Sequence, residues 1–146
     1  MKIRNMEAAD YDRIYSLWLS CAGMGLNTLD DSRAGIEKFL MRNPDTCFVA
    51  EENDTLIGVI LAGSDGRRGY IYHTAVVPSG RHQGIGNLLV KNVLTAMKAQ
   101  GIHKVALVAF NKNKSGNDFW AKQGFIARDD LVYRNKALTE LIRIDT

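Results

Sequence analysis

The sequence predicts a mixed α/β or α+β fold built around one sheet. Segments with apolar residues at helical spacing alternate with short apolar runs that are typical of strands. A helical segment also lies between the strand-like runs 70–77 and 103–110, and a helical crossover makes the strands that it joins parallel. The chain has 146 residues, of which 46% are hydrophobic, and we predict a single domain over residues 1–146.

The first third of the chain is predicted to hold one strand and two helices. Met1–Arg4 alternates between apolar and polar residues, as an edge strand does. Four apolar residues at i, i+3, i+4 and i+7 line one face of a helix: Ile14, Leu17, Trp18 and Cys21. A second helix begins after the N-cap residue Ser32 and ends at Asn43-Pro44, because a residue before proline disfavours helical backbone.

Strands and helices alternate in the rest of the chain. The runs 47–51 and 56–62 predict a hairpin, and a third strand covers Tyr70–Val77. The next helix ends at Gln100-Gly101, and six apolar residues share one of its faces: Ile85, Leu88, Leu89, Val93, Ala96 and Met97.

The last third repeats the plan of strand, helix and strands. A strand covers His103–Phe110, and a helix ends at Gln123-Gly124. We predict further strands from Phe125 through Tyr133.

Composition and charge exclude several classes of protein. A net charge of +3, dispersed along the chain, indicates neither a nucleic-acid nor a membrane partner. Cys21 and Cys47 lie in apolar surroundings without CxxC spacing, so we expect reduced core residues of a cytoplasmic protein. His73, His82 and His103 share no metal-ligand spacing, and no metal site is predicted. The N-terminus is polar and no segment approaches the roughly 20 apolar residues of a membrane helix, so we expect neither export nor a membrane span.

Two glycines mark the best candidate for a binding site. Gly84 and Gly86 lie between the strand that ends near Val77 and the helix that starts near Ile85. The first amides of a helix lack intrahelical partners and carry partial positive charge, so they bind phosphate, and glycine permits its close approach. A P-loop needs Lys followed by Ser or Thr after the glycines, and a dinucleotide-binding loop needs glycine at Leu89, so neither motif fits.

With its neighbours, this loop resembles the cofactor motif of the GNAT family of N-acetyltransferases. Residues 76–86, Val-Val-Pro-Ser-Gly-Arg-His-Gln-Gly-Ile-Gly, match the pattern R/Q-x-x-G-x-G/A after V-x-P. Residues 111–125 resemble the family's second cofactor segment, N-x-x-A-x-x-L/F-Y-x-x-x-G-F, and residues 65–76 are similar to a bacterial YpeA-like subgroup. The resemblance covers nearly the whole chain. It implies a mostly antiparallel sheet, a parallel strand pair splayed at the cofactor site, and helices on both faces.

The resemblance implies acetyl-CoA as the cofactor and assigns residues to it. The strand end pairs with the pantetheine arm, and the loop amides hold the pyrophosphate beside an arginine. Two asparagines reach the pantetheine or the pyrophosphate, and the aromatic pair after them walls the thioester end, although Phe119 is equally well explained as helix core. The cofactor-binding residues implied in this way are Val76, Val77, Arg81, His82, Gln83, Gly84, Ile85, Gly86, Asn87, Asn113, Asn117, Phe119 and Trp120.

The resemblance also implies acetyl transfer to a primary amine by direct attack in a ternary complex. The Val76 amide is implied as the donor to the carbonyl oxygen that gains negative charge. His73 is a candidate general base, with a packed sheet histidine as the alternative, and strand alternation predicts that Tyr72 and His73 face opposite sides. Trp120 stands where the family usually has a tyrosine acid, and indole does not supply a proton usefully in water. We therefore expect the proton for the leaving thiolate from Tyr133, Tyr72 or water.

The acceptor is expected to be a small-molecule or peptide amine. In the family, the first two helices, their loop and the last strands form the acceptor side, and here that loop contains Asp30 and Asp31. These carboxylates either attract an ammonium group or cap the following helix. Nothing in the sequence demands an oligomer, and a homodimer through a sheet edge is compatible with it. The family often has a glutamate base on the strand where this chain has Tyr72-His73. Because that glutamate and the usual tyrosine acid are missing, the main alternative is a non-catalytic acyl-CoA-binding module.

Overall fold

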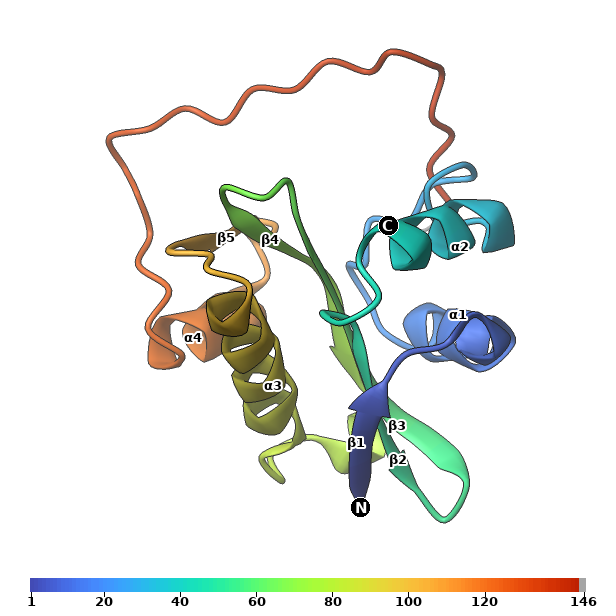
Figure 1. Ribbon diagram of the computed structural model, residues 1–146. Coiled ribbons are helices and arrows are strands. Elements are labelled where there is room, and N and C mark those ends of the chain that lie inside the picture. The colour runs from blue at the N-terminus through green and yellow to red at the C-terminus, as the bar shows by residue number, and fades with distance from the viewer. Residues whose placement is uncertain (145–146) are drawn as a thin grey trace.

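The computed structural model describes residues 1–144, which form a sheet with the strand order β1-β2-β3-β4-β5 (Figure 1). Neighbouring strands are antiparallel except β4 and β5, which are parallel. The predicted mixed, mostly antiparallel sheet is therefore confirmed. The strands are Lys2–Asn5 (β1), Phe48–Glu52 (β2), Thr55–Ser64 (β3), Gly69–Val76 (β4) and Val105–Leu107 (β5).

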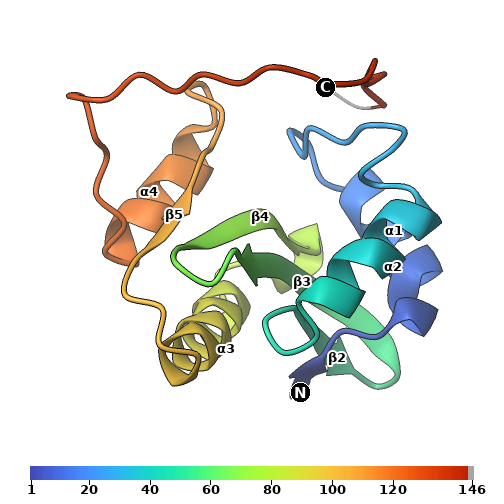
Figure 2. The same cartoon turned by 45° about the horizontal axis from the view of Figure 1, so that its top comes forward.

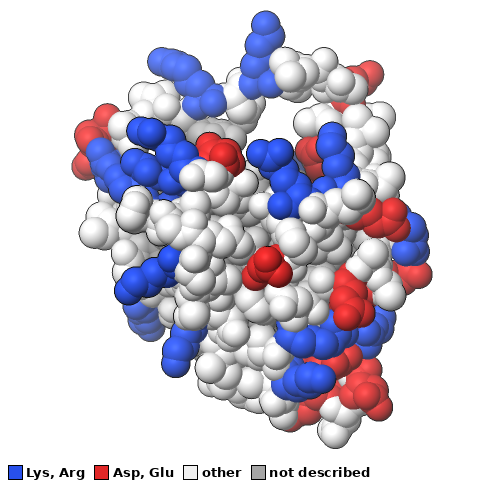
Figure 3. Space-filling model, viewed as in Figure 1, with Lys and Arg blue, Asp and Glu red and all other residues white. Residues whose placement is uncertain are grey.

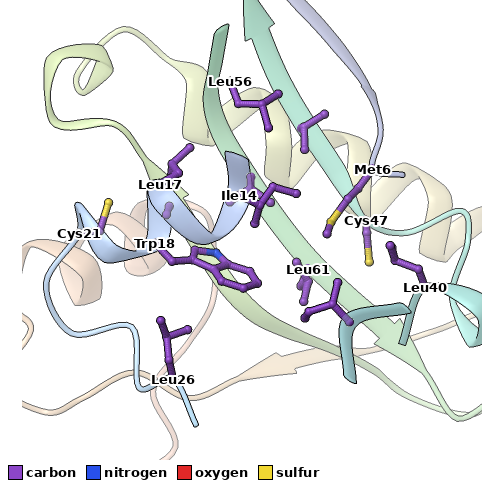
Figure 4. Packing of buried hydrophobic residues seen from close by; sticks show 14 residues of the cluster. Met6, Ile14, Leu17, Trp18, Cys21, Leu26, Leu40, Cys47, Leu56 and Leu61 are labelled. Atoms are coloured by element: carbon purple, nitrogen blue, oxygen red, sulfur yellow. The ribbon is translucent and has the colours of Figure 1, made fainter. Parts of the chain in front are cut away.

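Helices α1 (Tyr11–Leu19) and α2 (Arg33–Arg42) lie on one face of the sheet (Figures 1 and 2). A short 3-10 helix, η1 (Ala8–Asp10), precedes α1. Figure 4 shows Ile14 and Trp18 of α1 directed toward the sheet, and both side chains are completely buried. Ser32 is the N-cap of α2, as predicted, because its Oγ accepts a hydrogen bond from the third amide of the helix, 3.0 Å away.

The two cysteines are core residues of this layer, as predicted. Cys21 and Cys47 are both free and buried. Burial raises the pKa of the Cys47 thiol to about 12, which keeps that thiol protonated at neutral pH.

Helix α3 (Ile85–Ala99) covers the opposite face and contacts β2, β3 and β4. A Cβ on Gly58 of β3 would lie 3.0 Å from the Ile85 side chain and 3.1 Å from that of Leu89, so glycine lets α3 approach the sheet closely. Helix α4 (Lys114–Lys122) follows β5 and lies on the α3 side (Figure 1). None of the helices in residues 1–144 has both the length and the apolar character of a membrane span.

Strand β4 contains a bulge at Tyr72 and His73. The flanking residues Ile71 and Thr74 pair with residues of β3 that have only one residue between them. Two residues of β4 therefore oppose one residue of β3, and the alternation of side chains is interrupted at this point.

Because of the bulge, Tyr72 and His73 both face the α1–α2 layer. The ring of Tyr72 lies 5.5 Å from that of Phe39 in α2, and the ring of His73 lies 4.9 Å from that of Trp18 in α1. The prediction that they face opposite sides of the sheet was wrong, because strict alternation holds only in a regular strand.

The predicted strands from Phe125 through Tyr133 do not form, and this prediction was wrong. Residues 126–141 instead make an extended C-terminal arm that crosses from α4 to the loop between α1 and α2 (Figures 1 and 2). Tyr133, expected on a strand, lies on this arm with 64% of its surface exposed. The space-filling view shows an opening beneath the arm, with basic side chains on its rim (Figure 3).

Both ends of the C-terminal arm are anchored away from β5. The amide of Phe125 donates to the carbonyl of Trp120 over 3.0 Å, and the amide of Ile144 donates to the carbonyl of Leu26 over 2.9 Å. A strand requires a neighbour that exchanges main-chain hydrogen bonds with it, and apolar sequence alone does not supply one.

Candidate functional site

The loop between β4 and α3 presents a row of free amides. His82 and Gly84 have left-handed backbone, with φ angles of 62° and 81°. The amides of residues 82–87 donate no hydrogen bond to any group in residues 1–144. The positive end of the α3 dipole lies at the same place, so the loop can hold an anion such as a pyrophosphate.

The two glycines of the motif do different things. A Cβ on Gly84 would meet nothing within 4 Å, so the space above this turn is open to a ligand. A Cβ on Gly86 would lie 3.0 Å from the Phe119 ring, so this glycine lets α4 pack against the first turn of α3. Gly80, which the sequence motif leaves unexplained, is buried between the side chains of Val77 and Ile85.

Beyond the loop, one edge of β4 is open. Strands β4 and β5 pair only through residues 69–71 and 105–107, after which β4 has no strand partner on that edge and pairs only with β3 on the other. The amide of Val77 donates to the carbonyl of Ile57 in β3, so the amide and carbonyl of Val76 point to the open edge. There the Val76 carbonyl accepts from Nε of Arg81, 3.3 Å away, and from Sγ of Cys21, 3.7 Å away.

Asn113 and Asn117 are engaged within their own segment. Oδ1 of Asn113 accepts from the amide of Gly116 over 3.1 Å and so caps α4. Nδ2 of Asn117 donates to the carbonyls of Asn113 and Phe110, at 2.8 and 3.0 Å. Both side chains stabilise the start of α4 and the turn before it, and their contact with the cofactor stays a prediction.

Three aromatic rings hold α4 against the body of the protein. The ring of Trp120 lies 5.0 Å from that of Phe119 and 5.3 Å from that of Phe125, in edge-to-face geometry. Asn87 in the first turn of α3 accepts a hydrogen bond from Gln123 at the end of α4. Phe119 thus packs beside Gly86 of the loop, and Trp120 packs against Phe119 and Phe125.

A group of tyrosines lies on the α1–α2 side of β4. The rings of Tyr70 and Tyr72 are 4.7 Å apart. Burial raises the pKa of the Tyr72 hydroxyl, and the charges of Asp30 and Tyr133 raise it further. Tyr72 is therefore a protonated hydroxyl at neutral pH and can donate a proton or a hydrogen bond.

His73 is bonded to Asp31, a pair that spacing does not predict because the residues are 42 positions apart. Nε2 of His73 lies 2.6 Å from Oδ1 of Asp31. Asp31 does not cap α2, since Ser32 does.

Thr74 is a further residue that the sequence did not single out. Its Oγ1 is buried and has no hydrogen-bond partner in residues 1–144, which is rare for a polar atom. Because the amide of Val77 bonds to β3, alternation along the strand directs the amide of Ala75 to β3 and the amide of Thr74 to the open edge. A bound group at this edge would find both the hydroxyl and the amide nearby.

Comparisons with known proteins all point to one family of acetyltransferases. The model described as "Acetyltransferase (GNAT) family" matches residues 11–125. An acetyltransferase of Sodalis glossinidius is 30% identical over 96% of this chain and 97% of its own length. An acetyltransferase of Pectobacterium atrosepticum is 33% identical over 77% of this chain and 79% of its own.

Solved structures show the same fold. The Ard1 protein of Thermoplasma volcanium matches with a TM-score of 0.77 at 21% identity, covering 86% of this chain and 82% of its own. The PaiA N-acetyltransferase of Thermoplasma acidophilum, in complex with coenzyme A, matches with a TM-score of 0.74 at 19% identity, covering 88% and 91%. At these sequence identities, the two matches show a shared fold.

Proposed function

The chain belongs to the acetyltransferase (GNAT) family, and on that basis we propose that it transfers an acetyl group to a primary amine by direct attack in a ternary complex. Membership makes the chain an acyltransferase with acetyl-CoA as its donor. The observation that carries the proposal is the row of free amides at residues 82–87 beside the open edge of β4. Free amides can bind a pyrophosphate, and an open strand edge can pair with an extended pantetheine arm.

The residues present fit this cofactor. The open space over Gly84 leaves room for a phosphate, and the Val76 and Thr74 amides leave main-chain donors for an extended ligand. When bound, the cofactor supplies an activated acetyl group. The Val76 amide would then donate to the acetyl oxygen as that oxygen gains negative charge, and Arg81, which bonds to the Val76 carbonyl, would supply a positive charge nearby.

The chain offers groups for both proton transfers. His73 is the candidate that takes the proton of the acceptor amine, and its ring keeps 16% of its surface exposed. Tyr72, Tyr133 or water supplies the proton of the leaving thiolate, because Trp120 has no acidic proton. The raised pKa of Tyr72 keeps its proton available at neutral pH.

We propose a small-molecule or peptide amine as the acceptor, bound over the α1–α2 side of β4. The tyrosines there and the nearby carboxylate of Asp30 support a cationic or polar acceptor. An aminoglycoside acetyltransferase and a ribosomal-protein-alanine N-acetyltransferase are among the proteins of the same fold, which illustrates a small-molecule and a protein acceptor.

A thiol-release assay tests the function. With acetyl-CoA and a panel of polyamines, amino acids, aminoglycosides and peptides, we expect free thiol above the hydrolytic background with at least one amine. Calorimetry on the same samples measures binding of acetyl-CoA. If acetyl-CoA binds but no amine causes thiol release, the proposed enzymatic activity is contradicted. That result would favour the alternative, a non-catalytic acyl-CoA-binding module, which is suggested by Trp120 in place of the usual tyrosine.

We propose that the whole chain acts as one unit in the cytoplasm. The family match over residues 11–125 and the relative that aligns with 96% of the chain support one unit. The two free cysteines in the core support a reducing compartment.

We further propose a homodimer in which the C-terminal arm of one copy adds to β5 of another. Beyond β5, Val108 is 55% exposed, and on the arm Leu131 and Val132 are 61% and 73% exposed. These residues offer an open edge and an extended apolar segment. Light scattering should give a dimer that Val132→Asp converts to a monomer, whereas Met41→Asp, at an 85% exposed site on α2, leaves it intact. A monomeric wild type would contradict the proposal.

A further inference from the structure

We propose that Asp31 is a positioning residue that holds His73 as the base for the acceptor amine. The inference rests on the proposed acetyl transfer, and it concerns the protonation and orientation of one imidazole. Its basis is the bond between a buried carboxylate on the α1–α2 loop and a ring on the bulge of β4.

The carboxylate of Asp31 is fixed by its surroundings. Its side chain is 5% exposed, and Oδ1 lies 2.6 Å from Nε2 of His73. Oδ2 accepts from the amide of Asn27 over 2.8 Å, and the Asp31 carbonyl accepts from the hydroxyl of Tyr11 over 2.6 Å. With both carboxylate oxygens engaged, Asp31 has little freedom to turn away from the ring.

The bond selects one tautomer of His73. A carboxylate only accepts hydrogen bonds, so Nε2 carries the proton and Nδ1 of the neutral ring is left as the acceptor. Nδ1 makes no hydrogen bond to residues 1–144, and it is not among their buried unpaired atoms. A free and accessible lone pair is what a general base needs.

The ring is also placed beside the open edge of β4. The bulge turns His73 toward the α1–α2 layer, together with Tyr72, whereas an unbroken strand would separate them. The fully buried ring of Trp18 meets the imidazole edge to face and forms a rigid wall. Thr74, the next residue, is the first beyond the bulge whose amide points to the open edge.

When the amine nitrogen bonds to the acetyl carbon and the carbon–sulfur bond of the thioester breaks, His73 would take one proton from that nitrogen at Nδ1, become a cation and later release the proton to water. The charge of Asp31 stabilises that cation across the 2.6 Å contact. The other titratable groups around the pair are the Tyr11 hydroxyl from α1, bonded to the Asp31 carbonyl, the adjacent Tyr72 of β4, and Asp30 of the loop. None of these three is hydrogen-bonded to the ring, so Asp31 is the group that orients it.

A purely structural role for the pair would be a tether between the loop and β4. Nuclear magnetic resonance of the histidine ring nitrogens separates the two roles without any substrate. We expect the Nε2–H tautomer of His73 in the wild type, and a mixture of tautomers in Asp31→Ala. Asp12→Asn, at an exposed carboxylate of α1, is the control and should keep the wild-type spectrum. An Nδ1–H tautomer in the wild type, or an unchanged tautomer in Asp31→Ala, would overturn the proposal.

Kinetics with the best amine of the panel test the catalytic consequence. His73→Gln should lower kcat/KM at pH 7 about 100-fold and recover above the pKa of the amine, where the acceptor is already neutral. Asp31→Asn should lower kcat about 10-fold with little change in KM for acetyl-CoA, and move the acid limb of the pH profile to lower pH. Asp31→Glu should restore part of kcat. A tether would instead lower the thermal stability of these variants and leave the shape of the pH profile unchanged.

The outcomes distinguish this inference from the proposed function. If the wild type binds acetyl-CoA without turnover, the acetyl transfer fails, and with it the role of His73 as a base, while the tautomer experiment still decides whether Asp31 orients the ring. If the wild type turns over and His73→Gln keeps a wild-type pH profile, the acetyl transfer stands and the Asp31–His73 pair is overturned.

Discussion

Gly84→Val is expected to weaken the binding of acetyl-CoA about 1000-fold. The substitution places a branched side chain in the open space over the loop, at a backbone φ of 81° that valine disfavours. Losing two hydrogen bonds to a charged pyrophosphate, each worth about 2 kcal/mol, amounts to roughly 4 kcal/mol, and every 1.4 kcal/mol is about tenfold in Kd. Calorimetric titration with acetyl-CoA measures the loss directly.

Gly101→Val is the matched control. Gly101 follows the other end of α3, has a φ of 77°, and likewise has nothing within 4 Å of a Cβ. Both variants should therefore lose a similar free energy of unfolding, about 1–3 kcal/mol for the strained backbone, while only Gly84→Val loses the cofactor. Equal affinities for acetyl-CoA in the two variants would show that the loop does not hold the pyrophosphate.

The parts of the site that could be predicted from the sequence are local. The loop around Gly84 depends on neighbouring residues of one strand, one turn and one helix, and such short-range patterns are legible in a single sequence. The Ser32 cap and most of the buried face of α3 were predicted for the same reason, although Leu88, expected on that face, is exposed and Val90, which was not, is buried. Each of these features has its cause within a few residues of itself.

The parts that were missed depend on residues far apart in the chain. The bulge at Tyr72 and His73 is a property of how β4 pairs with β3, and the bond from His73 to Asp31 spans 42 positions. The C-terminal arm has apolar residues like those of a strand, yet whether it pairs is decided by where its two ends are anchored. Periodicity predicts which side chains are buried, but it does not predict which distant residues they contact.

A buried ion-pair network predicts the largest effect on stability. Asp10, whose side chain is 3% exposed, accepts hydrogen bonds from Arg4 at 2.8 Å and from Arg13 at 2.7 Å, and from the amide of Glu7 at 2.9 Å. Arg4 also bonds to Glu51 of β2 over 3.1 Å, so the network ties β1 and η1 to α1 and the sheet. Burial by itself raises the pKa of Asp10, but the hydrogen bonds from Arg4, the Glu7 amide and Arg13, together with the charge of Arg4, outweigh it and hold the pKa below its usual value.

Asp10→Asn should lower the free energy of unfolding at pH 7 by about 3 kcal/mol, because it leaves two guanidinium groups facing a neutral amide. Asp10 has a lower pKa in the folded chain than in the unfolded chain, where it is about 3.9. Its contribution is therefore fully present above about pH 4 and disappears as the pH falls through the folded value. Urea unfolding at pH 7 and near pH 2 measures the free energy of unfolding of wild type and variant. The difference between them should be large at pH 7 and smaller near pH 2.

The control for this network is Asp12→Asn, whose carboxylate is 81% exposed and pairs with a half-exposed Arg33. An exposed pair of this kind contributes less than about 1 kcal/mol because water and salt screen it. Asp12→Asn should therefore unfold like the wild type at both pH values. Asp10→Asn could instead lose no more free energy of unfolding than Asp12→Asn. The cost of burying the Asp10 charge would then cancel the stabilisation that its bonds to the two arginines contribute. The network would then fix where β1 meets α1 without stabilising the fold.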